Sequence, residues 1–307
     1  MKDIAVIIPC HDAAHLVGGQ LAALARQRTR YDWEVVVVDD GSRDDLSGAV
    51  DRYRDVLPAV RIVAHHPRRG TGAARNAGAR ASDARLLLFL DADDEVADGY
   101  LDAMAAALDG AGMVTADIDY RRLNSPRVLR STPPDQLCDV LTPSLFLPNV
   151  PGGLMGTTRE LFDELGGFDE ELPALADIDL SWRAQLAGRR IAVAATVVSV
   201  AVRTTHLARL RRARFQARDA VVLREKFAGQ GLDPAGWAEH VRQWIRLAGL
   251  LPGVVRPAGR ARLAWQLGWQ LGTLDTLRGA RRTGRVRTVP RPAGSSVPVR
   301  PWKGQAS

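Results

Sequence analysis

The sequence predicts an α/β protein in which a mostly parallel sheet is flanked by helices. Short apolar runs without polar alternation recur early in the chain, a pattern typical of strands that are buried on both faces. Helical patterns separate these runs at the spacing of βαβ units. Several of the runs end in acidic residues. Ligands of open α/β sheets bind beyond the carboxyl ends of the strands, so these acids are candidates for a functional site.

Four strands are expected, at residues 4–8, 34–38, 60–64 and 86–90. Pro9 is expected to end the first strand, because proline cannot donate a hydrogen bond within a central sheet. Ser42 and Asp45 have the spacing of a capping box for the helix that follows the second strand. A glycine-rich stretch after the third strand predicts a loop that leads into a helix. Asp98 is the expected cap of a helix over residues 99–108.

The later part of the chain is expected to be mainly helical. Residues 121–151 match no regular pattern, and long irregular segments of this kind are often lids or binding loops. Residues 281–307 contain four prolines and little apolar content, which predicts a disordered tail. Helices are expected at residues 158–165, 176–187, 206–227, 236–251 and 260–277, with one or two strands within residues 191–202. The predicted domains are residues 1–205, a basic helical extension over residues 206–280, and the tail.

Charge is distributed unevenly along the chain. Residues 1–179 carry 18 Lys/Arg and 30 Asp/Glu, a net charge of −12, whereas residues 180–307 carry 24 and 5, a net charge of +19. The two halves add to the overall charge of +7. A basic half of this kind is expected to meet an anionic partner, such as a membrane surface, a phosphorylated substrate or a nucleic acid.

The sequence favours a cytoplasmic protein. Cys10 and Cys138 are its two cysteines, which supports no disulfide framework and indicates a reducing compartment. Lys2 and Asp3 lead directly into an apolar run that is too short for the core of a signal peptide. No apolar run approaches the ~18 residues needed to span a bilayer. Peripheral contact with the inner face of a membrane stays open as an alternative.

Three acids, Asp91, Asp93 and Asp94, directly follow the fourth predicted strand. Carboxylates this close repel one another, and they either take up protons or hold a cation. Mg²⁺ or Mn²⁺ is the expected cation, because such ions prefer oxygen ligands and are held by one or two carboxylates together with substrate phosphates. A calcium-binding EF-hand is excluded, since Val96 occupies the sixth loop position, which requires glycine, and Asp102 the twelfth, which requires glutamate.

Six short motifs follow one another along the first 205 or so residues. They are Ile7-Ile8-Pro9, Val38-Asp39-Asp40-Gly41-Ser42, Ala74-Arg75-Asn76-Ala77-Gly78, Leu90-Asp91-Ala92-Asp93-Asp94, Gly166-Gly167-Phe168-Asp169-Glu170 and Asp177-Ile178-Asp179-Leu180-Ser181-Trp182-Arg183. Each motif alone is weak, but their order and spacing resemble glycosyltransferase family 2, including its actinobacterial-type members. The resemblance implies a Rossmann-like GT-A fold with a C-terminal helical extension. It also implies that residues 1–205 form a catalytic domain that binds a nucleotide sugar.

The resemblance implies roles for the residues of these motifs. Asp39 and Asp40 would hold the base and ribose of the activated sugar, and the loop at Pro9 and His11 would contact the base. A carboxylate can accept hydrogen bonds from a pyrimidine N–H or a ribose hydroxyl, which makes the role of the two acids chemically reasonable. The alternative is that this stretch merely caps a helix through Ser42.

The diphosphate and the metal would be held by later motifs. Arg75 and Asn76 would lie near the diphosphate, although an arginine here is alternatively an exposed helix residue. Asp91, beside Ala92, would face the ribose, and Asp93 would coordinate the metal. Asp94 would shape the turn. His206 is a candidate for a further metal ligand, or alternatively a solvated residue at the start of a basic helix.

The helix that begins near Asp177 is where the family keeps its general base, commonly in a Glu-Asp-x-Asp pattern. Here Ala176 stands in place of the glutamate. The resemblance implies that Asp177 takes the proton from the acceptor hydroxyl in a single displacement that inverts the anomeric configuration. Asp179 is expected to pair with Arg183, four residues further along the helix.

These patterns lead to the hypothesis of an inverting, metal-dependent glycosyltransferase. It would move a sugar from a nucleotide donor, a UDP-sugar being favoured, to an acceptor hydroxyl of unknown identity, and no nucleic acid partner is expected. One alternative is transfer to polyprenyl phosphate or another lipid at a membrane surface, because the late tryptophans and arginines fit an interfacial anchor as well as helix packing. Another is a non-catalytic protein that binds an anionic ligand or a membrane. Phosphoryl transfer of the haloacid-dehalogenase kind is disfavoured. It needs a nucleophile near the first strand and a later lysine, whereas this sequence has almost no lysine: Lys2, Lys226 and Lys303.

Overall fold

The computed structural model of the chain describes residues 1–133, 136–137, 140–141, 145–202, 205–232 and 237–279. The chain divides into two compact units. The first comprises Met1–Leu123, Asp139–Leu141 and Asn149–Ala201, and the second comprises Asn124–Cys138, Thr142–Pro148 and Val202–Ser307. The second unit therefore includes part of the segment that the sequence left unassigned. The functional boundaries at residues 205 and 280 stay predictions, and the expected tail lies outside the described residues.

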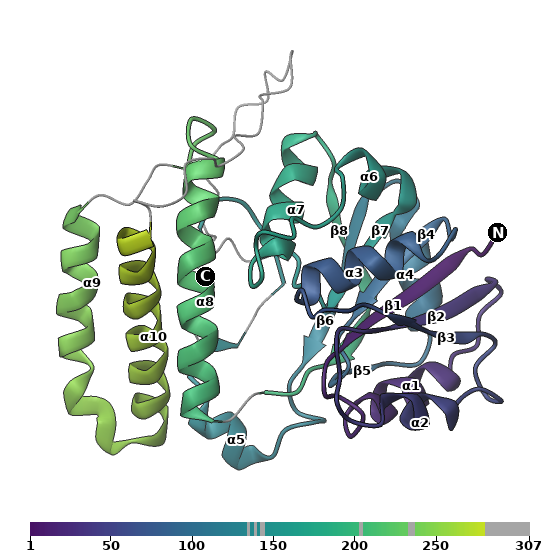
Figure 1. Cartoon of the computed structure of the whole chain (residues 1–307), viewed down its shortest axis with the longest axis horizontal. Helices are drawn as coiled ribbons and strands as arrows, with labels where there is room; N and C mark the ends of the chain where they lie inside the picture. Colours follow the sequence, from purple (N-terminus) through teal and green to yellow (C-terminus); the bar gives the residue numbers. More distant parts are fainter. Residues whose placement is uncertain (134–135, 138–139, 142–144, 203–204, 233–236, 280–307) are drawn as a thin grey trace. The chain divides into compact units, whose positions relative to one another are not determined.

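The first unit is built on an eight-stranded mixed sheet with the strand order β3-β2-β1-β4-β7-β6-β8-β5 (Figure 1). The strands are β1 (Ile4–Cys10), β2 (Trp33–Asp39), β3 (Val60–Ala64), β4 (Leu86–Leu90), β5 (Glu95–Val96), β6 (Met113–Asp119), β7 (Leu154–Thr158) and β8 (Ile191–Ser199). β1 to β4 form one parallel block, which confirms the four predicted strands and the α/β fold class. β7 runs antiparallel to β4 and β6, while β6 and β8 are parallel.

Helices cover both faces of this sheet. Val6 and Leu88 belong to the apolar core that also contains residues of α1 (Val17–Ala25), α2 (Leu46–Asp51) and α4 (Tyr100–Leu108). On the opposite face, α3 (Thr71–Arg80) approaches Ile7 and Val38 at Gly78, where a Cβ would lie 2.9 Å from the Val38 side chain. Phe162, on α6 (Arg159–Glu164), packs on Phe89 with ring centroids 5.5 Å apart. Alternate strand residues thus face two helical layers, as their uninterrupted apolar character predicted.

Three local predictions in the first unit are wrong. β1 continues through Pro9, where it still pairs with β2. Its pairing with β4 ends at Ile7, so the edge of β1 that faces β4 is unpaired at Pro9. A residue without an N–H is tolerated at such an edge. Asp45 caps α2 by accepting from the Gly48 N–H at 3.0 Å, and the helix starts too late for a capping box from Ser42. The cap of α4 is Gly99 in a left-handed conformation (φ +75°), without a side-chain hydrogen bond from Asp98.

Three of the described strands, β5, β6 and β7, were not predicted. β7 has the sequence LMGTT, which is short and only half apolar. Its Gly156 lies between two neighbours, and a Cβ there would be 2.7 Å from Val114 of β6 and 2.8 Å from Leu88 of β4. The glycine of β7 is therefore required by the close approach of its neighbouring strands. A requirement of this kind leaves no periodic apolar pattern in the sequence. The helix expected from Thr158 is present as α6, with Thr158 as its N-cap.

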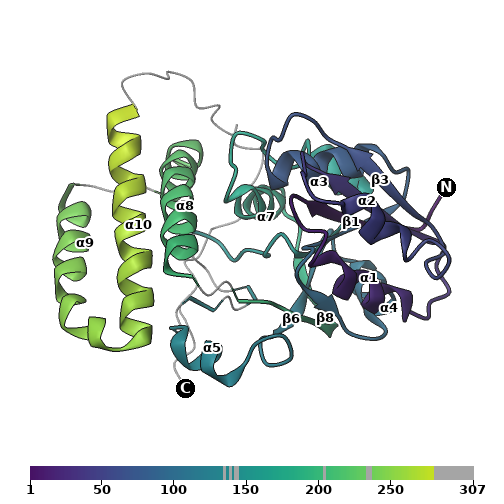
Figure 2. The same cartoon turned by 60° about the horizontal axis from the view of Figure 1, so that its bottom comes forward.

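The second unit contains helices α5 (Pro126–Ser131), α8 (His206–Lys226), α9 (Trp237–Gly249) and α10 (Pro257–Gly279), with the 3₁₀ turn η2 (Leu251–Val255) before α10. Within this unit α10 lies between α8 and α9 in both views (Figure 1, Figure 2). The helices predicted from residues 206, 236 and 260 are thereby confirmed. In the part of the chain that the structure describes, no helix is both long and apolar enough to cross a membrane.

Small residues allow α8 and α10 to approach closely. A Cβ on Gly272 of α10 would lie 2.8 Å from the Ala217 Cβ and 2.9 Å from the Arg214 carbonyl carbon of α8. Beside this contact, Asp275 of α10 accepts from Arg214 and Arg218 of α8, each at 2.6 Å. These two arginines hold the pKa of Asp275 down, to about 2, with the Arg214 hydrogen bond as the largest cause. Close packing and a shared carboxylate together fix the helix pair.

We expect Gly272→Ala to lower the free energy of unfolding by about 1–3 kcal/mol, because the added methyl group overlaps α8. Gly249→Ala in α9 is the matched control, since a Cβ there meets nothing within 4 Å. Urea denaturation followed by circular dichroism measures both. Equal stability of the two variants would contradict the close approach of α8 and α10.

Candidate active site

Asp91, Asp93 and Asp94 lie at the carboxyl end of β4, in the turn that leads to β5. Each offers one carboxylate oxygen within 4.8 Å of the other two. Asp94 is buried and accepts from the Ala201 N–H at 3.1 Å, which agrees with its expected role in shaping the turn. Asp91 and Asp93 are half-buried. This cluster of hard oxygen ligands fits Mg²⁺ or Mn²⁺.

Gln20 of α1 closes the same turn from the core side. Its side chain is fully buried, donates to the Asp91 carbonyl oxygen at 3.4 Å and accepts from the Val96 N–H at 3.0 Å. The sequence analysis did not identify Gln20. The available signal was a polar residue on the otherwise apolar face of a predicted helix.

Arg75 of α3 forms an ion pair with Asp91, with Nη2 and Oδ1 2.7 Å apart. Its side chain is only 7% exposed, and its guanidinium lies 5.5 Å from the centre of the Phe168 ring. The alternative of an exposed helix residue at this position is therefore wrong. The buried cation offsets part of the repulsion among the three acids.

The Gly152-Gly153 pair connects this cluster to α7 (Ala176–Leu186). The Gly152 N–H donates to Asp177 Oδ2 at 2.8 Å, and a Cβ on Gly152 would lie 2.7 Å from the Arg75 Cζ. A Cβ on Gly153 would lie 2.6 Å from the Asp91 Cγ. Bare backbone thus passes directly between the Asp177 carboxylate and the Arg75–Asp91 pair. The sequence analysis missed both glycines, whose signal was a Pro-Gly-Gly stretch just before an apolar run.

Asp177 lies in the first turn of α7 and is half-buried. Its second oxygen accepts from the Ile178 N–H at 2.9 Å, so backbone donors orient both oxygens. A carboxylate at a helix N-terminus is also favoured by the helix dipole. Ala176 is buried and its Cβ faces α3 at Gly72, so the position where the family commonly has glutamate is filled by helix packing.

Asp179 and Arg183 form the expected pair, which is confirmed with Nη2 and Oδ2 2.6 Å apart. Asp179 is fully buried. Arg183 also donates to the carbonyl oxygens of Leu165 and Gly167 at 2.6 and 2.8 Å. The pair therefore fastens the loop at residues 165–167 to α7.

Asp39 and Asp40 differ in their surroundings. The Asp40 carboxylate is buried, accepts from the N–H groups of Arg69 and Gly70 at 2.9 Å, and lies 2.9 Å from His65 Nδ1. It thus anchors the loop at the start of α3. Asp39 accepts from the Ser42 N–H at 2.8 Å, and its side chain remains 22% exposed. Asp39 is therefore the one of the two acids that a ligand can reach.

Asn76 is buried and holds the loop that follows α6. Its Oδ1 accepts from the Phe168 N–H at 2.9 Å, while its Nδ2 donates to the Phe168 carbonyl oxygen at 2.9 Å and to Glu170 at 3.0 Å. The motif around Asn76 and the motif around Phe168 are thus two sides of one contact. In this structure the Asn76 amide is occupied by the protein itself.

The remaining predicted donor contacts lie around the end of β1. His11 Nδ1 lies 3.1 Å from the Asp40 carbonyl oxygen, and Pro9 is half-buried at the end of the strand. Ala92 is 8% exposed and belongs to the apolar core.

His206 begins α8 in the second unit and lines a pocket of that unit. Its role as a metal ligand stays a prediction.

The acids also influence Cys10, the buried last residue of β1. Burial, with the nearby carboxylates of Asp39, Asp44, Asp91 and Asp93, raises the pKa of its thiol to about 12. The acids at the end of β2 and those after β4 therefore both raise the pKa of the same thiol. This part of the first unit is an electronegative site suited to a cation.

Comparison with known proteins agrees with this geometry. Residues 5–166, more than half of the chain, match the family model of glycosyl transferase family 2. The chain belongs to glycosyl transferase family 2. A relative of this family 2 chain is validoxylamine A glucosyltransferase of Streptomyces hygroscopicus subsp. jinggangensis (strain 5008), which is 38% identical over 34% of this chain and 25% of its own. The chain spans about a quarter to two fifths of the length of the curated relatives it matches.

Solved structures show the same fold. The mannosyltransferase PcManGT from Pyrobaculum calidifontis, in complex with GDP-Man and Mn²⁺, superposes with a TM-score of 0.55 at 24% identity, over 93% of this chain and 78% of that one. S. aureus TarS 1–349 in complex with UDP gives 0.51 at 19% identity, over 90% and 92%. The family 2 chain therefore has the GT-A fold that its motifs implied.

We expect Gly153→Ala to weaken Mn²⁺ binding by about 10–100-fold, because the new methyl group displaces the Asp91 carboxylate without removing any acid from the cluster. Gly18→Ala in α1 is the control, since its Cβ would make an ordinary 3.4 Å contact with the Tyr53 hydroxyl. Isothermal titration calorimetry with Mn²⁺ measures both variants. Unchanged affinity in Gly153→Ala would show that the position of Asp91 does not matter for the metal.

Proposed function

We propose that this chain is an inverting, metal-dependent glycosyltransferase. It moves a sugar from a nucleotide-diphosphate donor, a UDP-sugar being favoured, to an acceptor hydroxyl. The observation that carries the proposal is the contact of Asp177 and the Arg75–Asp91 pair through Gly152 and Gly153, since it brings a candidate base beside a candidate metal site. Membership of family 2 supports glycosyl transfer, and the fold is shared with structures described with UDP, with UDP-GlcNAc, and with GDP-Man and Mn²⁺.

Asp93, with help from Asp91, is the proposed holder of Mn²⁺ or Mg²⁺. Their carboxylate oxygens are close enough to share one hard cation. When bound, such an ion acts as a Lewis acid that stabilises charge on the leaving nucleoside diphosphate. Arg75 keeps Asp91 oriented and adds positive charge beside the diphosphate.

Asp177 is the proposed general base. Two backbone N–H groups orient its carboxylate, and a carboxylate oxygen is the chemical group that can take up the acceptor's hydroxyl proton. As that proton passes to Asp177, the acceptor oxygen forms a bond to the anomeric carbon. The bond from that carbon to the diphosphate breaks on the opposite side. One displacement of this kind inverts the anomeric configuration.

The donor's nucleotide is proposed to lie against Asp39 and the loop of Pro9 and His11. Asp39 is the accessible acid there, whereas Asp40 acts by positioning the loop before α3. Asn76 similarly positions the loop at Phe168. Loss of either amino acid would thus affect donor affinity through a displaced loop.

The expected test compares Asp93→Ala and Asp177→Asn with the wild type, using a panel of nucleotide sugars and release of the nucleoside diphosphate in the presence of Mn²⁺. Asp93→Ala is expected to lose metal-dependent donor binding. Asp177→Asn is expected to keep donor binding and to lose about 10²–10⁴-fold in turnover, the usual contribution of a general base.

Asp163→Asn, at an exposed position on α6, controls for loss of a carboxylate as such. Full activity in both site variants would overturn the mechanism. A product that retains the donor's anomeric configuration, as measured by NMR, would overturn the inversion.

A second candidate is transfer to a lipid-linked acceptor by an enzyme bound at the cytoplasmic face of a membrane. The observation that favours it is the exposed apolar face of α9, where Val241, Trp244 and Ile245 are 43%, 41% and 67% exposed at helical i, i+3, i+4 spacing. Leu251 and Val255 of η2 are exposed as well. Apolar residues with tryptophan, on a helix that also carries arginine, fit the interface of an anionic membrane.

The double variant Trp244→Ser/Ile245→Ser is expected to lower flotation with phosphatidylglycerol vesicles by roughly tenfold, because it removes the buried apolar contact with the bilayer. Val193→Ser, at a similarly exposed position on β8, is the control. Undiminished flotation of the double variant would rule out α9 as the anchor. Vesicle binding without any binding of UDP and Mn²⁺ would favour the non-catalytic alternative over both enzymes.

A further inference from the structure

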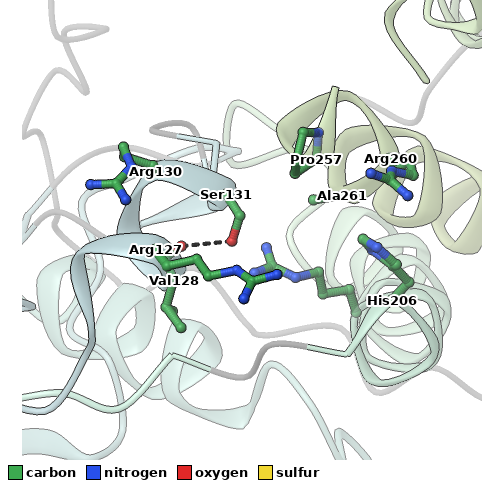
Figure 3. Close-up of a pocket in the computed structure, with 9 residues that line it drawn as sticks. Arg127, Val128, Arg130, Ser131, His206, Pro257, Arg260 and Ala261 are labelled. Atoms are coloured by element: carbon green, nitrogen blue, oxygen red, sulfur yellow. Dashed lines mark hydrogen bonds between the residues drawn. The ribbon is translucent and has the colours of Figure 1, made fainter. Parts of the chain in front are cut away.

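The second unit contains a pocket of about 540 Å³ lined by α5 and by the first turns of α8 and α10 (Figure 3). Its lining includes four arginines and a histidine: Arg127, Arg130, Arg209, Arg260 and His206. None of the described residues that line it is acidic. In Figure 3, Arg127 extends from α5 toward the helix that carries His206. Arg260 borders the pocket on the same side as His206. The pocket is therefore strongly cationic.

No acid among the described residues neutralises the arginines of the pocket. Among the residues that the structure describes, no carboxylate lies within ion-pair distance of any of the four. Two other arginines of α8 behave differently, since Arg214 and Arg218 share Asp275. An acid therefore pairs with the arginines further along α8, whereas the described lining of the pocket contains none.

Arg209 is the central observation. Its side chain is buried, with the residue only 7% exposed, and burial lowers its pKa. Nη1 donates to Gln136 at 2.7 Å and Nη2 donates to Thr132 at 3.0 Å, so both of these partners are uncharged. Its Nε is buried and has no partner among the described residues. A buried cation with an unused N–H is costly, and an anion in the pocket would supply the missing partner.

Helix geometry adds to this preference. α8 starts at His206 and α10 starts at Pro257, and both residues line the pocket. The N-terminal ends of two long helices, of 21 and 23 residues, therefore border the same cavity. Unpaired N–H groups and the helix dipole favour anions at such ends.

We propose that this pocket binds a phosphate group, as a phosphomonoester or a diphosphate, carried by a larger molecule. Guanidinium groups match phosphate oxygens in a fork geometry, and several of them suit an anion with more than one charge. The volume exceeds that of a bare phosphate and lies in the range of pockets for small-molecule ligands. The proposal does not depend on the proposed sugar transfer, because the pocket belongs to the second unit and contains none of the acids of the candidate active site. It also gives His206 a cationic environment that suits an anion better than a metal ion.

The test uses the full chain and inorganic pyrophosphate as the probe, without divalent metal, so that the acid cluster of the first unit cannot bind it through a cation. Calorimetry at low ionic strength compares the wild type with Arg127→Gln/Arg260→Gln. Both arginines have exposed side chains, so the double variant is expected to fold. Its affinity for pyrophosphate is expected to fall roughly tenfold or more, because charge-assisted hydrogen bonds are lost.

The matched control is Arg211→Gln/Arg212→Gln, which removes the same charge from exposed positions of α8 that do not line the pocket. It is expected to bind pyrophosphate as the wild type does. Absence of wild-type binding, or an equal loss in both double variants, would overturn the proposal, since the second result means unspecific attraction to a basic unit.

A second arm distinguishes the source of the phosphate. Vesicles with phosphatidic acid are compared with vesicles of equal charge density that carry phosphatidylserine, whose phosphate is a diester. Preferential loss of phosphatidic acid binding in Arg127→Gln/Arg260→Gln would support a lipid headgroup as the ligand. Loss of pyrophosphate binding with unchanged vesicle binding would support a soluble phosphorylated molecule.

Discussion

The ion pair between Arg75 and Asp91 is the interaction on which the candidate active site depends. Three carboxylates follow β4 within 4.8 Å of one another, an arrangement that would repel itself without a nearby cation. Arg75 supplies that charge from α3, and its burial against Phe168 prevents it from moving into solvent. The glycine pair can then pass over the ion pair and reach Asp177. A sheet, two helices and a loop are thus held together around one buried guanidinium.

Several residues of the family motifs support this arrangement without facing a ligand. Asp40 and Asn76 are buried and hydrogen-bonded to loops, and in the Asp179–Arg183 pair beside Asp177 the arginine donates to the loop at residues 165–167. Their partners come from separate motifs, so the order of motifs along the chain reflects contacts between them. Motif residues in this fold therefore also hold loops to one another.

The sequence predicted those parts of the fold whose cause is local. β1, β2 and β4 are buried on both faces, and each contains an unbroken apolar run that can be recognised without knowledge of its neighbours, whereas β3 lies at the sheet edge and is only half-buried. β7 could not be predicted because Gly156 is required by the side chains of β4 and β6, which the sequence does not place. The acids of the site were predictable as carboxylates at strand ends. Gln20, Gly152 and Gly153 were not, because their roles arise only from tertiary contacts with those acids.

The glycine pair at positions 152 and 153 also affects how this site can diversify. The wall between Asp177 and the acid cluster is main chain, and any side chain there would collide with Arg75 or Asp91. Point substitutions cannot change the shape of such a wall in small steps, since every residue other than glycine adds at least a Cβ. A change in the shape of this wall therefore requires replacement of the loop as a whole.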